Sequence, residues 1–77
     1  MISINSPKAS FIAEKLAGKE IDGVNFELVK MQGMSVIMKT NDDAKAKIVV
    51  KSYIGSMPEM KYKVLTVGIL DDQGRLI

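Results

Sequence analysis

Residues 24–40 read VNFELVKMQGMSVIMKT, and this stretch decides the fold. Apolar and polar residues alternate from Val24 to Leu28, which is the period of a half-buried strand. Gln32-Gly33 interrupts the pattern, and a second alternating run follows from Met34 to Lys39. Two alternating runs around a glycine predict a β-hairpin with Gly33 at or next to its turn.

A helix is expected before the hairpin, over residues 7–17. Ser6 offers a capping hydroxyl, and Pro7 suits the first helical position. The apolar residues are spaced as on one buried helical face, and Gly18 follows where a left-handed residue often ends a helix. They are Ala9, Ile12, Ala13 and Leu16. Residues 2–4 alternate and predict a short strand before this helix.

A second helix is expected after the hairpin, over residues 43–54. Asp42 and Asp43 supply capping oxygens and negative charge where the helix dipole is positive. An apolar stripe at helical spacing follows, consisting of Ala46, Val49, Val50, Tyr53 and Met57. Residues 61–70 are rich in β-branched and aromatic side chains and predict a strand, with residues 75–77 as a short returning strand.

The resulting order is strand, helix, strand, strand, helix, strand. We therefore predict a single α+β domain over residues 1–77, with two helices on one face of a four- to five-stranded antiparallel sheet. The order resembles the ferredoxin-like βαββαβ topology. If residues 2–4 do not form a strand, an αββαββ arrangement takes its place.

The composition limits the metal-binding and catalytic chemistry that the side chains can support. The 77 residues include no histidine and no cysteine, the side chains that most often serve metal binding, thiol chemistry and acid–base catalysis near neutral pH. The 11 basic and 9 acidic residues leave a formal net charge of +2, which is ordinary for a small domain. No signal-like or membrane-spanning run is present. We expect a non-enzymatic, cytoplasmic protein without metal or cofactor and without a membrane partner.

Apolar residues on the outer face of the sheet are the strongest functional signal. Two helices cannot cover both faces, so Val29, Met31 and Ile37 are expected to point outward, with Met34 next to the hairpin turn. The last strand adds either Leu65, Val67 and Ile69 or Tyr62, Val64 and Leu70, depending on how it is turned. We predict a protein-interaction or regulatory module that forms a homodimer or binds another protein. Its predicted contact residues are Val29, Met31, Met34, Ile37, Leu65 and Val67.

Two other functions are kept as alternatives. A regulatory domain of this topology would bind a small metabolite at a dimer groove near Gly18 and Gly55. Nucleic-acid binding through Lys45, Lys47 and Lys51 is less favoured, because acidic residues are interleaved with these lysines. The second run of the hairpin also lacks the aromatic side chains on which RNA-recognition sheets stack bases.

Overall fold

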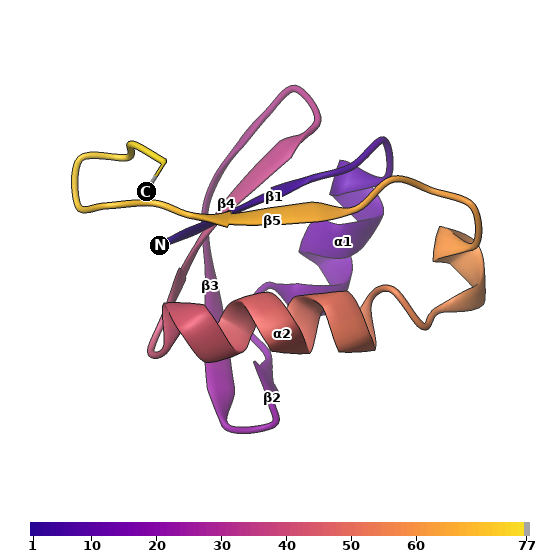
Figure 1. The fold of residues 1–77 in the computed structure, drawn as a ribbon, viewed down its shortest axis with the longest axis horizontal. Coiled ribbons are helices and arrows are strands. Elements are labelled where there is room, and N and C mark those ends of the chain that lie inside the picture. Colours follow the sequence, from indigo (N-terminus) through magenta and orange to yellow (C-terminus); the bar gives the residue numbers. More distant parts are fainter. Residues whose placement is uncertain (77) are drawn as a thin grey trace.

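The computed structural model describes residues 1–76 as an α+β fold with a five-stranded antiparallel sheet in the order β2-β3-β4-β1-β5 (Figure 1). The predicted class is confirmed. The elements in chain order are β1 (Ile2–Asn5), α1 (Ala9–Leu16), β2 (Glu20–Ile21), β3 (Val24–Gln32), β4 (Ser35–Thr40), α2 (Asp43–Tyr53), a 3₁₀ turn η1 (Pro58–Met60) and β5 (Thr66–Ile69).

The predicted hairpin is present as β3 and β4, joined by the two-residue loop Gly33-Met34. Gly33 has a φ of 61°, and Met34 is not among the residues with positive φ. A positive φ at the first loop position alone is typical of a type II′ turn, which needs glycine there. The glycine therefore fixes both the turn and the register of the strands.

The short strand β2 was not predicted from the sequence. It pairs with the start of β3 through a second tight turn, in which Asp22 and Gly23 have φ values of 52° and 81°. Two successive positive φ angles are typical of a type I′ turn, for which Asp-Gly is a preferred sequence. The Asp-Gly pair was the signal that could have located this strand.

Strand β1 lies inside the sheet and pairs antiparallel with both β4 and β5. Ile2 and Ile4 are completely buried. The expectation of a strand at residues 2–4 is confirmed. The αββαββ arrangement depended on its absence and is not supported.

Both helices pack most of their apolar stripes into a single core, together with one face of the sheet, which we call the helix-covered face. Tyr53 of the predicted α2 stripe is instead 38% exposed. From α1 this core takes the four predicted residues, and from α2 it takes Ala46, Val49 and Val50. From the sheet it takes Ile2, Ile4, Val24, Phe26, Val36, Met38 and Val67. The opposite side, which carries Ser3, Ile37 and Lys39, is called the open face.

Two predicted boundaries were wrong. Helix α1 begins at Ala9, because the Ser6 hydroxyl accepts a hydrogen bond from the Lys8 backbone N–H at 3.1 Å and forms a turn ahead of the helix. The last strand is confined to Thr66–Ile69, because Pro58 starts the 3₁₀ turn and Tyr62 follows it with a left-handed φ of 67°. The expected returning strand is reduced to one bridge between Leu70 and Leu76, and Ile77 lies outside the described residues.

The start of α2 is tied to the start of the chain. Asp42 caps the helix by accepting a hydrogen bond from the Lys45 N–H at 3.1 Å. The Asp43 carboxylate accepts one from the Met1 ammonium at 2.8 Å and another from the Thr40 hydroxyl at 2.5 Å. Burial raises the pKa of Asp43, but the two hydrogen bonds and the attraction of the ammonium together lower it below its usual value.

Candidate interaction surface

The end of the β3–β4 hairpin extends away from α2 (Figure 1). We call residues 28–34 of this hairpin the arm. Strand β4 holds the arm in place, and the Ser6 N–H donates to the Met34 carbonyl at 3.0 Å. The Ser35 hydroxyl also donates to the Asn5 side chain beside the arm. The arm is therefore a fixed part of the sheet along its β4 side.

A β-bulge divides the arm into two registers. Leu28 lies opposite Met38, but Lys30 already lies opposite Ile37, so Val29 is the extra residue. Residues opposite each other in an antiparallel pair point to the same face. Beyond the bulge, Met31 lies opposite the buried Val36. Met31 therefore lies on the helix-covered face, as Leu28 does.

The bulge makes the prediction for Met31 wrong. Uninterrupted alternation placed Met31 on the open face with Val29, whereas the extra residue returns it to the helix-covered face. Val29 itself lies on the open face, where it lines a pocket of about 350 Å³ together with Lys30, Gln32, Ile37 and Leu70. The arm consequently presents apolar side chains on both faces.

The outer edge of β3 has a neighbour only near its start. The Gly18 N–H donates to the Phe26 carbonyl at 2.9 Å, and the Phe26 N–H donates to the Lys19 carbonyl at 2.9 Å. Among the described residues, no strand pairs with this edge beyond Phe26. We call residues 27–32 the free edge of β3.

Four apolar side chains on the arm are exposed although α1, α2 and the sheet bury a complete core elsewhere. The exposed fractions are 41% for Leu28, 50% for Val29, 42% for Met31 and 64% for Met34. Lys30 is the only charged residue within the arm. The combination of apolar side chains and unpaired backbone on one protruding segment is typical of a site that pairs with another strand.

The rest of the predicted contact surface is covered by the chain itself. Ile37 lies on the open face but is only 9% exposed. The C-terminal segment returns beside it, with Leu70 lining the same pocket and the Leu76 side chain lying directly over Gly68. This segment therefore takes the place on the open face that the sequence assigned to a partner.

Two orientations of the last strand were predicted, and Leu65 and Val67 were named as contact residues for the one in which they point outward. The structure has the other orientation. Val67 lies opposite Ile4 and is only 7% exposed, and Leu65 is partly buried against the core. Leu70 belongs to the open face instead, as in the other orientation. Of the predicted contact residues, Val29, Met31 and Met34 remain accessible and lie together on the arm.

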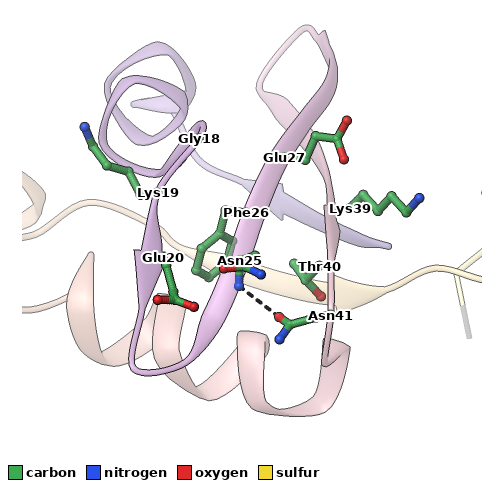
Figure 2. Close-up of a pocket in the computed structure, with 9 residues that line it drawn as sticks. All are labelled: Gly18, Lys19, Glu20, Asn25, Phe26, Glu27, Lys39, Thr40 and Asn41. Carbon is green, nitrogen blue, oxygen red and sulfur yellow. Dashed lines mark hydrogen bonds between the residues drawn. The ribbon is translucent and has the colours of Figure 1, made fainter.

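A second pocket, of about 400 Å³, lies at the other end of the hairpin beside β2 (Figure 2). Asn41 closes its lower side, accepting from the Asn25 N–H at 2.8 Å and donating to the Gly23 carbonyl at 3.0 Å. Its charged lining residues are Lys19, Glu20, Glu27 and Lys39. Because the charges are balanced, the lining has no net preference for an anion or a cation.

The glycines named for a metabolite groove are not brought together. Gly18 lines the pocket beside β2, whereas Gly55 lies at the end of α2 against Lys51 and Leu65. The three lysines named for nucleic acid all belong to α2, where Lys45 and Lys51 are exposed and Lys47 is half-buried. The Lys45 ammonium lies near Gly23 in the β2–β3 turn.

The described residues contain no group of three or more acidic side chains placed to hold a metal ion. Within that same part of the chain, no helix combines the length and the apolar character needed to cross a membrane. Comparisons with protein-family models, with curated proteins and with solved structures found no match to this chain.

Proposed function

We propose that this protein is a small non-catalytic interaction module that self-associates through the arm. The observation that carries the proposal is the free edge of β3, where unpaired backbone coincides with the exposed Leu28, Val29 and Met31. Proteins usually protect such an edge with charges, prolines, bulges or a covering element. Here the free edge carries two charges of opposite sign, Glu27 and Lys30, and the bulge at Val29, but no proline, and no strand of the described residues pairs with it.

The size of the domain supports this proposal. A chain of 77 residues without cysteine has a small core and no disulfide, so association is one of the routes by which it gains stability. The arm needs no rearrangement to bind, because β4 and Ser6 already hold it in place. Pairing therefore requires little loss of backbone freedom.

We also propose that the topology is ferredoxin-like. With the two-residue β2 set aside, the strand order is β3-β4-β1-β5, and every neighbouring pair is antiparallel. Strand β4 thus lies between β1 and β3, and β1 lies between β4 and β5, which is the interleaving that the split βαβ arrangement requires. This topology is shared by proteins of many functions and carries none of the functional argument.

The experiment is sedimentation velocity from about 10 µM to about 1 mM, a range that spans the weak affinities expected of a small interface. We expect the dimer fraction to rise with concentration, and Val29→Lys to shift the protein to monomer. Ile48→Lys is the matched control, because Ile48 is an exposed apolar residue on α2, outside the arm. A wild-type chain that stays monomeric throughout, or a dimer that Val29→Lys leaves intact, would overturn the proposal.

Metabolite sensing and nucleic-acid binding stay predictions. A metabolite that bound in the pocket beside β2 would raise the melting temperature in a thermal-shift screen. Binding of nucleic acid through the α2 lysines would weaken steeply with salt. Among residues 1–76, no contact favours either function over pairing through the arm.

A further inference from the structure

We propose that the strand pairing with the arm is the arm of a second copy, antiparallel, with the two-fold axis between Val29 and Lys30. This inference rests on the proposed function and specifies its partner and register. It follows from three properties of the free edge: its length, the direction of its backbone groups and the faces of its side chains.

The length of the free edge defines the register. Pairing cannot extend before residue 27, because Phe26 already bonds to Gly18 and Lys19, and it cannot extend past residue 32, where the turn begins. When residues 27–32 pair antiparallel with themselves over their full length, three kinds of opposing pair result. Glu27 lies opposite Gln32, Leu28 opposite Met31, and Val29 opposite Lys30 of the second copy.

The backbone groups fit this register. Phe26 directs its N–H and C=O toward β2, and alternation directs those of Leu28 to the same edge. Gln32 and Ser35 close the two-residue loop and so bond to each other, which turns the groups of Met31 outward. Leu28 and Met31 are thus the residues with backbone groups available at the free edge, and the register places them opposite each other.

The side chains fit as well, and the bulge is the reason. In a regular strand, residues three apart point to opposite faces, so opposing residues 28 and 31 would be mismatched. The extra residue Val29 puts Leu28 and Met31 on the same helix-covered face. Glu27, Lys30 and Gln32 lie on the open face by the same pairing. Each opposing pair therefore consists of residues from one face.

The charges favour a second copy over an unrelated strand. On the open face, Lys30 lies opposite Val29 of the second copy and diagonal to that copy's Glu27, within reach of a long side chain. Because the dimer has two-fold symmetry, the contact between Lys30 and Glu27 of the second copy occurs twice. On the helix-covered face, Leu28 and Met31 cover each other twice, which accounts for both of their exposed surfaces.

The opposite edge of the sheet, formed by β5, offers less apolar surface to a pairing strand. Strand β5 spans only Thr66–Ile69, and its Val67 is already buried in the core. Pairing there would cover little additional apolar surface. The β3 interface is itself small, so we expect a dimer with a dissociation constant of roughly 100 µM, weaker than that of a standard-size interface.

The test uses pairs of charged substitutions at Leu28 and Met31, which are both exposed and therefore leave the core intact. In L28K/M31E, the proposed register places each lysine opposite a glutamate of the second copy. In L28K/M31K, the same register places lysine opposite lysine. We expect sedimentation to show a dimer for the first variant, and at least about tenfold weaker association for the second.

The outcomes separate the two proposals. If both variants lose the dimer equally while the wild type retains it, the arm is the interface but the register is wrong, and this inference is overturned. If both variants dimerise as the wild type does, the interface lies elsewhere and the proposed function falls too. Circular dichroism of each variant confirms that loss of the dimer is not loss of the fold.

Discussion

Leu28 and Met31 lie on the same face of the sheet although they are three residues apart, because the bulge at Val29 inserts one residue between their registers. Both side chains are exposed, and both lie at the edge of β3 that has no neighbouring strand within the described part of the chain. If these residues alternated without a bulge, Leu28 and Met31 would point to opposite faces. The bulge therefore puts both side chains on the one face that the proposed register uses.

Deletion of Val29 tests this relationship. The shortened strand retains the face of each remaining residue, because Lys30 then simply follows Leu28 in regular alternation. In the self-paired register, however, the two-fold axis then passes through Lys30. Lys30 therefore lies opposite Lys30 of the second copy, and the like charges repel. We expect a folded chain with dimerisation weakened about tenfold, measured by sedimentation. Unchanged dimerisation after the deletion would show that the bulge has no part in association.

Ile4 tests the central position of β1. It is completely buried between β4 and β5, so Ile4→Ala leaves a cavity in the core. We expect a loss of about 2–5 kcal/mol in the free energy of unfolding, enough to unfold much of a domain this small. Leu28→Ala is the matched control and should cost under about 1 kcal/mol in the monomer, because Leu28 is exposed. Urea denaturation at low protein concentration, where the chain is monomeric, measures the free energy of unfolding of both variants. Equal losses of stability in the two variants would contradict the assigned core.

Gly68 tests the cover that the C-terminal segment forms over the open face. A Cβ at this position would collide with the end of the Leu76 side chain, so Gly68→Ala must displace that side chain. We expect a small loss of stability, under about 1 kcal/mol, because a flexible side chain can move. In a Leu76→Ala background the same substitution should cost nothing. A double-mutant cycle by urea denaturation gives the coupling, and its absence would mean that Leu76 does not lie over Gly68.

Asp43 predicts how stability depends on acid. Its pKa is lower in the folded chain than the ordinary value near 3.8, so the unfolded chain binds the proton first and acid favours unfolding. The stabilisation is fully present above the unfolded pKa and is lost as the pH falls through the folded pKa. We expect the free energy of unfolding of the wild type to exceed that of Asp43→Asn by about 1 kcal/mol at pH 6, and this difference to vanish towards pH 2.

The matched control for this pH series is Asp72→Asn, because Asp72 is exposed in the C-terminal turn. Its stability should follow that of the wild type at every pH. A difference between wild type and Asp43→Asn that is constant from pH 6 to pH 2 would show that the Met1 ammonium and Thr40 do not favour the ionised carboxylate.

The hairpin, both helices and the first strand could be predicted from the sequence because each has a local signal. Alternation up to Leu28 and the glycine at residue 33 are sufficient for the hairpin. The face of Met31 was predicted wrongly, although the sequence carries a signal for the bulge: the alternation changes phase at the adjacent apolar pair Leu28-Val29, after which Lys30 and Gln32 are polar and Met31 is apolar. The face of Val67 depends on pairing with β1, which is distant in sequence. That pairing buries one of the predicted contact residues.

The most direct test of self-pairing is hydrogen exchange of the Leu28 and Met31 amides, measured by NMR at about 20 µM and about 1 mM, on either side of the expected dissociation constant of roughly 100 µM. Both amides point toward the free edge, so they should exchange quickly in the dilute sample and become protected in the concentrated one. The amides of β1, already bonded within the sheet, should change little and serve as the internal reference. Equal protection of Leu28 and Met31 at both concentrations would contradict pairing of the arm with a second copy.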